Sequence, residues 1–140
     1  MNFKQFQNIY SGQDWRSTWF TRQDWIKKEG SEYFSWIVPV TIAGAQSSIE
    51  IGQQFPRARK YLPLDFIEVM NNDVVNLTLI INNNEFLPVP AASIRPMAGN
   101  KLWQISVRND DAAAPSTLNS IIVTLRRQPQ TIDDWARRQP

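Results

Sequence analysis

The middle of the chain alternates apolar and polar residues with a period of two, and this pattern constrains the fold more than any other feature. In VVNLTLII (residues 74–81) every second residue from Val75 is apolar, and SIIVTLRR (residues 120–127) repeats the pattern from Ile121. A β-strand points successive side chains to opposite faces, so these segments predict strands with one buried face. Strands of a parallel sheet are usually apolar on both faces, and the alternation therefore favours antiparallel pairing.

Asn, Gly and Pro residues divide this pattern into six or seven short strands. NNNE (residues 82–85) predicts a tight turn, because Asn tolerates the left-handed conformation that such turns need. In EFLPVPAASI (residues 85–94), Pro88 and Pro90 cannot donate ladder hydrogen bonds, which places this strand at a sheet edge. Short alternating strands at regular spacing predict an all-β fold, either an antiparallel β-sandwich or a small barrel, and we expect the jelly-roll-like sandwich.

The inward phase of the predicted strands contains two of the six Trp residues. The expected inward side chains are Trp36, Val38, Val40 and Ile42 in SWIVPVTI, and Trp103, Ile105 and Val107 in LWQISVR. Large apolar side chains in that phase usually form the core, so we expect both Trp36 and Trp103 to be buried.

Three regions differ in composition along the chain. Residues 1–33 are polar and rich in Trp, residues 34–127 carry the alternating pattern, and residues 128–140 form a charged tail. We therefore expect an N-terminal helical arm, one sandwich domain and an extended C-terminal tail. A chain of 140 residues can bury a sizeable core within a single domain.

The N-terminal arm contains a helix signal. An SGQD capping box predicts a helix over about residues 12–28. At 100° per residue, Trp15, Trp19 and Ile26 fall within roughly 40° of one another on that helix. Gly30 then stands where a helix commonly ends.

The residue types exclude much of enzyme chemistry. The chain contains no His and no Cys, which removes most transition-metal sites and the nucleophile pairs that use these residues. Asp65 and Glu68 have an odd separation and so point to opposite faces of a strand, as do Asp110 and Asp111. No carboxylate pair suited to glycoside hydrolysis results. We therefore expect no enzymatic activity and no cofactor, and a carboxylate-dependent hydrolase ranks third among the functions considered.

The NND tripeptide at residues 71–73 fits two structures. Its side-chain oxygens suit a hard cation such as calcium. Asn and Asp between two strands, however, more often form a plain turn. We expect the turn and no metal site.

The charge distribution gives no sign of a nucleic-acid partner. The formal net charge is +2, from 15 Lys and Arg against 13 Asp and Glu. A nucleic-acid-binding domain usually presents a clustered basic face, which this balance does not provide. The chain also lacks an apolar run long enough for a signal peptide or a membrane span, so we expect cytoplasmic assembly without a membrane partner.

The two ends of the chain hold four of the six Trp residues. Interface cores enrich aromatic residues and Arg, so we expect the ends to contact copies of this chain or other proteins. The expected contact residues are Trp15, Trp19 and Trp25 in the arm, and Arg126, Arg127, Trp135, Arg137 and Arg138 toward the tail. The alternative is that both ends fold back on their own sandwich.

A carbohydrate-binding or receptor-attachment sandwich is the main competing function. Such sites stack sugar rings on exposed aromatic side chains and bind hydroxyl groups with Asn, Asp and Gln. The predicted loops AGAQSS, NNNE and RNDDAAAPST carry no aromatic residue. With Trp36 and Trp103 assigned to the core, glycan binding therefore ranks second.

The stretch from LDFIEVMNND to NSIIVTLRRQP, across residues 62–129, resembles the β-sandwich structural proteins of viruses, such as jelly-roll subunits and capsid-associated proteins. The likeness lies in Asn-rich turns, alternating strands, the lack of Cys and His, and polar ends, without a diagnostic motif. It implies a symmetric virion component assembled in the host cytoplasm, acting as a coat, vertex, decoration or tail protein through contacts between subunits.

Overall fold

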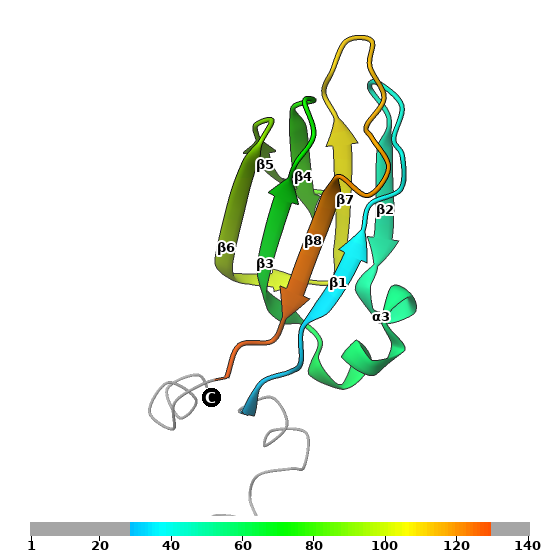
Figure 1. Cartoon of the computed structure of the whole chain (residues 1–140). Coiled ribbons are helices and arrows are strands. Elements are labelled where there is room, and N and C mark those ends of the chain that lie inside the picture. The colour runs from blue at the N-terminus through cyan, green and yellow to red at the C-terminus, as the bar shows by residue number, and fades with distance from the viewer. Residues whose placement is uncertain (1–28, 130–140) are drawn as a thin grey trace, which may run out of the picture.

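The computed structural model describes residues 29–129, which form a β-sandwich of two four-stranded sheets (Figure 1). Sheet A has the strand order β1-β8-β3-β6, and sheet B has the order β2-β7-β4-β5. All neighbouring strands in these two sheets are antiparallel. The predicted all-β fold and antiparallel sandwich are therefore confirmed.

The strands of sheet A are β1 (Phe34–Ile37), β3 (Leu64–Asn71), β6 (Ser93–Leu102) and β8 (Ile121–Arg126). The strands of sheet B are β2 (Gln46–Glu50), β4 (Leu77–Ile81), β5 (Glu85–Val89) and β7 (Gln104–Asn109). A short helix, α3 (Ile51–Gln54), and a 3₁₀ helix, η2 (Pro56–Tyr61), connect β2 to β3. The predicted limits of 1–33, 34–127 and 128–140 stay predictions, because only part of each terminal region lies within the described residues.

The core lies between the two sheets and is built from the inward phase of each strand. Its fully buried side chains include Ile67, Val69, Leu77, Leu79, Ile81, Ile105, Val107, Val123 and Leu125. Trp36 is 5% exposed and is part of this core, as predicted. The prediction for the proline-containing strand is also confirmed, because β5 pairs only with β4 and forms an edge of sheet B.

The first strand is shorter than its alternation predicted. β1 ends at Ile37, and Val40 and Ile42 are 48% and 68% exposed, so their assignment to the core was wrong. Pro39 cannot donate a hydrogen bond to continue the ladder. Beyond it, the Thr41 backbone N–H instead donates to Ser116 Oγ at 2.7 Å. This contact fastens the β1–β2 loop to the long β7–β8 loop.

The prediction for Trp103 was also wrong. Trp103 lies in the bend between β6 and β7, and its side chain is 51% exposed. The inward phase of β7 begins two residues later, at Ile105. Leu102 and Trp103 are consecutive apolar residues, so they could not both follow the alternation; Leu102 is the one that is buried.

Residues 51–61 fold into α3 and η2, which the sequence pattern did not predict. Neither a period of two nor a period of 3.6 is visible over so short a segment. Ile51 and Ala58 are fully buried and anchor the two turns to the core. Figure 1 shows this segment at the end of the sandwich that also holds the start of β1.

Gly30 links the N-terminal arm to the sandwich. Glu29 is helical and Gly30 has a φ of 84°, in agreement with a helix that ends at this glycine. The predicted helix over 12–28 lies outside the described residues. Ser31 N–H donates to the Arg127 carbonyl oxygen at 2.9 Å, which fixes the chain beside the end of β8.

We predict that Gly30→Ala lowers the free energy of unfolding by about 2 kcal/mol, because a Cβ would be both strained and crowded. It would lie 2.7 Å from the Pro129 nitrogen and 2.9 Å from the Arg127 carbonyl oxygen, both backbone atoms. Gly44→Ala is the control, since Gly44 has a φ of 77° but no atom within 4 Å of its added Cβ. Urea unfolding of both variants measures the difference, and equal losses would show that crowding contributes nothing.

Candidate functional site

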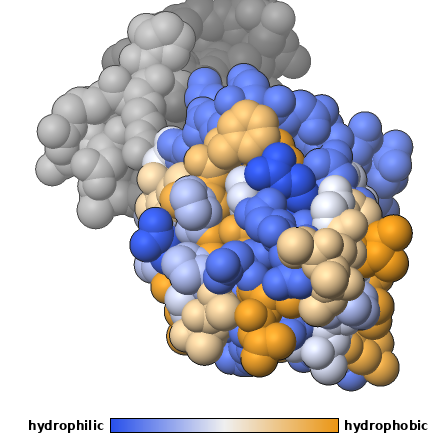
Figure 2. Space-filling view, turned by 90° about the horizontal axis from the view of Figure 1, so that it is seen from above, coloured by the Kyte–Doolittle hydropathy of each residue, from blue (hydrophilic) through white to orange (hydrophobic). Residues whose placement is uncertain are grey.

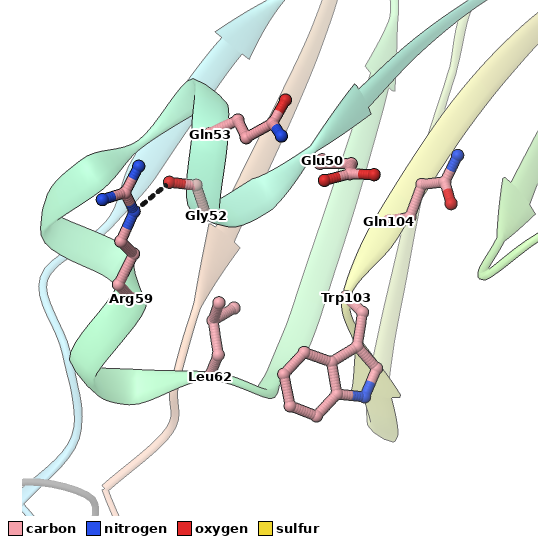
Figure 3. A pocket seen from close by; sticks show the side chains of 7 residues that line it. All are labelled: Glu50, Gly52, Gln53, Arg59, Leu62, Trp103 and Gln104. Carbon is pink, nitrogen blue, oxygen red and sulfur yellow. Dashed lines mark hydrogen bonds between the residues drawn. The ribbon is translucent and has the colours of Figure 1, made fainter.

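A pocket of about 440 Å³ lies where β2 runs into α3 and β6 bends into β7. Its lining residues are Glu50, Gly52, Gln53, Arg59, Leu62, Trp103 and Gln104. Figure 3 shows Trp103 and Leu62 together on one side of the pocket. The side chains of Glu50, Gln53 and Gln104 lie on the other side, and Arg59 lies at the margin.

The backbone on both sides of the pocket is fixed by hydrogen bonds. Trp103 N–H donates to Asn82 Oδ1 at 2.9 Å, and the Trp103 carbonyl oxygen accepts from Ile51 N–H at 3.1 Å. Glu50 and Gln104 are direct cross-strand partners in the β2–β7 ladder. The indole ring therefore stands on a fixed bend, with a carboxylate and an amide held beside it.

Arg59 is positioned by the backbone of α3. Its Nε donates to the Gly52 carbonyl oxygen at 2.8 Å, which holds the guanidinium group at the pocket margin. A Cβ on Gly52 would come within 3.2 Å of Leu62 Cδ1, so glycine permits this close packing. The pocket thus combines two apolar side chains with donors and acceptors whose positions are set by the fold.

The outer face of sheet B continues the polar surface beyond the pocket. Ser48 and Ser106 are cross-strand partners, and their hydroxyl oxygens lie 2.7 Å apart in a hydrogen bond. Farther along the sheet, Arg108 Nε donates to Asp110 Oδ1 at 2.7 Å, and Thr78 donates to the same carboxylate. A band of hydroxyl, guanidinium and carboxylate groups therefore leads away from Trp103.

The pocket favours binding over hydrolysis. Glu50 is the one carboxylate among its described lining residues, whereas glycoside hydrolysis uses a pair. Asp65 Oδ1 accepts from the Gln128 backbone N–H at 2.7 Å, and Asp111 accepts from two backbone N–H groups in its own loop. Within residues 29–129, no cluster of three or more candidate metal ligands is found.

The NND segment forms a turn in which the side-chain oxygens of Asn71 and Asp73 accept hydrogen bonds within the fold. Asn71 Oδ1 accepts from the Asp73 N–H at 3.0 Å, and the Asp73 carboxylate accepts from Val74, Thr117 and Ser120. Burial raises the pKa of Asp73, but these hydrogen bonds outweigh burial and hold the pKa below its ordinary value of 3.8. The carboxylate joins the β3–β4 loop to the loop before β8.

The folded state lowers the pKa of Asp73, so the ionised carboxylate stabilises the fold. This stabilisation is fully present at pH values above the pKa that an Asp side chain has in the unfolded chain, about 4. That contribution is lost as the pH falls through the lower folded-state pKa. We predict that Asp73→Asn costs about 2 kcal/mol at pH 7 and flattens the acid decline in stability. Denaturant midpoints between pH 7 and pH 2 measure this. Glu85→Gln, at the exposed start of β5, is the control, and an unchanged acid decline in Asp73→Asn would contradict the prediction.

Most of the predicted interface residues lie outside the described part of the chain: Trp15, Trp19, Trp25, Trp135, Arg137 and Arg138. Arg126 and Arg127 are described and make contacts within the chain. Arg126 Nη1 donates to the Tyr33 hydroxyl at 3.0 Å and its guanidinium stacks on that ring. Arg127 Nη1 donates to the Pro63 carbonyl oxygen at 2.8 Å. A role for any of these residues in an interface stays a prediction.

A second, smaller pocket lies between the start of β1 and the turn from α3 to η2. It has a volume of about 270 Å³ and includes Tyr33, Phe34, Phe55 and Arg57. Phe34 and Phe55 pack with ring centroids 5.5 Å apart and belong to or border the core. Arg57 is paired with Glu32 at 3.0 Å, so the charged groups of this pocket already have a partner.

Comparison with known proteins gives little information about function. No family model and no curated protein matches the chain. A similar solved structure is the Cupin_2 domain of an XRE family transcriptional regulator from Enterobacter cloacae. The match has 18% identity and a TM-score of 0.36, over 74% of this chain and 85% of that domain. At this TM-score the likeness supports no statement about what the present chain does.

The predicted resemblance to viral structural proteins was wrong. The structural comparison identifies a domain of a bacterial regulator and shows no likeness to a virion protein. The virion function and the virion location that followed from that resemblance are therefore withdrawn. The features behind it, alternating strands and Asn-rich turns, are general properties of antiparallel sandwiches.

None of the helices within residues 29–129 is long and apolar enough to cross a membrane.

Sequence reasoning missed the residues that line the main pocket. Glu50 and Gln104 are 54 positions apart in the sequence and meet only through the pairing of β2 with β7. One local signal was available, because Leu102 and Trp103 interrupt the alternation. A break of this kind requires that one of the two apolar residues faces away from the core.

Proposed function

We propose that this protein binds carbohydrate at the pocket around Trp103. The observation that carries the proposal is a half-exposed indole ring at the rim of a pocket whose other side is polar. Binding sites of this kind combine an apolar surface with a few convergent polar groups that set orientation. The flat apolar faces of a sugar ring would lie on Trp103, and its hydroxyl groups would reach Glu50, Gln53 and Gln104.

The polar residues supply both the hydrogen-bond donors and the hydrogen-bond acceptors that sugar hydroxyl groups need. The Glu50 carboxylate accepts, the Arg59 guanidinium donates, and the amide of Gln104 does both. These side chains are carried by strand ends and by short helical turns. A site on fixed elements loses little conformational entropy on binding, which favours useful affinity from few contacts.

The outer face of sheet B supports an oligosaccharide more than a single sugar. The polar band from Gln104 to Arg108 covers four residue steps of β7, which is about 13 Å. Ser106 lies between these two positions, and its buried hydroxyl forms a hydrogen bond with the hydroxyl of the exposed Ser48 on the same face. A chain of several sugar units would therefore find polar partners beyond the pocket.

A glycan array with the full chain tests the proposal. We expect saturable binding to at least one class of oligosaccharide, lost in Trp103→Ala and retained in Tyr33→Ala. Tyr33 is an exposed aromatic residue of the second pocket, so it controls for nonspecific loss of aromatic surface. Binding to no glycan, or loss in Tyr33→Ala with retention in Trp103→Ala, would contradict the proposal.

A further inference from the structure

The hydrogen-bond pattern shows which backbone groups of the edge strand β1 face away from sheet A. In an antiparallel pair, only every second residue directs its N–H and C=O groups to the neighbouring strand. Val38 N–H donates to the Ile121 carbonyl oxygen at 3.0 Å, in the same register that pairs β1 with β8. The alternate residues Ser35 and Ile37 therefore direct their backbone groups to the open edge of the sheet.

The pairing of β8 with β3 leads to the same assignment. Asn72 N–H donates to the Ser120 carbonyl oxygen at 2.9 Å, in the register of the β3–β8 pair. The even-numbered residues of β8, which lie opposite Ser35 and Ile37, therefore bond to β3 and not to β1.

Prolines protect the edge strands on the other side of the sandwich. By the same alternation, Pro88 of β5 and Pro96 of β6 stand where an N–H group would face away from the sheet. Proline removes that donor and hinders pairing with a further strand. Figure 1 shows β5 and β6 along one side of the sandwich and β1 and β2 along the other. Neither β1 nor β2 contains a proline, so their outward donors are available.

The open edge of β1 is limited at both ends. Ser31, before the strand, already donates its N–H to the Arg127 carbonyl oxygen at 2.9 Å. Pro39, after the strand, has no N–H, and its carbonyl oxygen accepts from Thr41 Oγ1 at 2.9 Å. The edge-facing residues between these limits are centred on Ser35.

Two exposed apolar side chains flank Ser35 at equal distances along the chain. Tyr33 and Ile37 are 59% and 53% exposed. Tyr33 continues the alternation of β1, because Arg126, which lies opposite it in the extended register, stacks on its ring. Within residues 29–129, no group bonds to the N–H of Ser35 or Ile37. The second pocket, which Tyr33 and Ser35 help to line, lies beside this edge.

We propose that a second copy of this chain adds its β1 strand to this edge in the antiparallel direction, with the two-fold axis at Ser35. Ser35 then pairs with Ser35 of the second copy, and Tyr33 pairs with Ile37 of the second copy. Both copies present the same edge, so the donors of one match the acceptors of the other. The pair of an aromatic and a β-branched side chain is favourable across strands. The two copies of sheet A become one continuous sheet.

The charges around β1 favour a second copy of the same chain. No charged residue lies between Tyr33 and Val38, so self-pairing places no like charges opposite one another. The nearest acidic residue, Glu32, is already paired with Arg57 at 3.0 Å.

Other surfaces of the sandwich fit a second copy less well. The open edge of β2 offers only polar side chains, those of Gln46, Ser48 and Glu50. Figure 2 shows the loop end of the sandwich, where apolar and polar groups are interspersed, as on a surface in contact with water. The β1 edge combines free backbone groups with exposed apolar side chains.

Charge variants of Ser35 in the full chain test this pairing. Ser35→Lys and Ser35→Glu each place like charges opposite one another at the two-fold axis, so each should weaken dimerisation by about tenfold or more. An equimolar mixture of the two variants should recover the dimer, because opposite charges then face each other. Ile94→Lys, at the comparably exposed open edge of β6, is the control and should leave the dimer unchanged. Sedimentation velocity over a concentration series measures all of these samples.

Amide hydrogen exchange in the unchanged chain tests the same contact without a substitution. At high concentration, the N–H groups of Ser35 and Ile37 should exchange about tenfold or more slowly than that of Ile94, and dilution should remove the difference. A chain that stays monomeric at every concentration overturns the proposal and leaves the edge to a strand of another protein. A dimer that Ser35→Lys does not weaken, or that the mixture does not recover, overturns it as well.

Discussion

Asn109→Ala should lower the free energy of unfolding by about 3 kcal/mol or more, among the largest losses for a single polar residue of this protein. Asn109 is fully buried. Its Nδ2 donates to the carbonyl oxygens of Thr41 at 3.0 Å and Ala114 at 2.9 Å, and its Oδ1 accepts from the Asp111 N–H at 2.9 Å. Alanine leaves the part-buried Ala114 carbonyl oxygen and Asp111 N–H without these partners, whereas the Thr41 carbonyl oxygen still accepts from the Ser116 N–H at 2.9 Å. Each unsatisfied group costs about 1–3 kcal/mol.

Asn71→Ala should have a similar effect, because Asn71 has the same role at the end of β3. Its Nδ2 donates to the carbonyl oxygens of Val75 and Pro90, and its Oδ1 accepts from Asp73. Asn72→Ala is the matched control, since Asn72 is exposed and should change stability by less than about 0.5 kcal/mol. Urea unfolding measures all three variants. If both Asn71→Ala and Asn109→Ala lowered the free energy of unfolding by less than about 1 kcal/mol, the conclusion that these side chains stabilise the loops by hydrogen bonds would be wrong.

Trp103→Ala should weaken carbohydrate binding by about tenfold to a hundredfold. Burying a large apolar side chain contributes about 1.5–3 kcal/mol, and each 1.4 kcal/mol is a factor of ten in affinity. Trp103→Phe should fall between Trp and Ala, because it keeps a smaller flat ring in the same place. Calorimetric titration with the glycan found on the array measures the series. Since the side chain is half-exposed, thermal unfolding should show that the variants remain folded.

Binding of carbohydrate at Trp103 would be contradicted if Trp103→Ala kept the affinity of the unchanged protein. Equal weakening by Trp103→Ala and Tyr33→Ala would indicate a general effect of aromatic surface and not a site. Gln104→Ala offers an independent check on the polar side of the pocket. It should weaken binding by a smaller factor, because a neutral hydrogen bond contributes about 0.5–1.5 kcal/mol net.

The fold could be predicted because strand alternation is a local signal. Each two-residue step in residues 74–81 and 120–127 reports which face is buried, and the pattern of turns then favours a sandwich. Asn82 and Asn83 have φ values of 51° and 62°, as expected for a turn rich in Asn. Local patterns fail where the chain bends, and Trp103 was placed in the core for that reason.

The candidate site could not be predicted because its parts are brought together by the topology. Glu50 and Gln104 become neighbours only when β2 pairs with β7, across an interval that contains four other strands. Arg59 and Leu62 belong to a short irregular segment with no periodic signal. The roles of the buried Asn71 and Asn109 are likewise only partly visible in the local sequence, because each also donates to a carbonyl oxygen in a distant loop, that of Pro90 and that of Thr41.

An NMR titration of the full chain with the glycan selected on the array tests the central claim most directly. The account predicts saturable shifts of the Trp103 indole N–H, identified by its absence in Trp103→Phe, and of the backbone amides of Glu50 and Gln104. Shifts confined to Tyr33, Phe55 and Arg57, or to any other part of the surface, would contradict it.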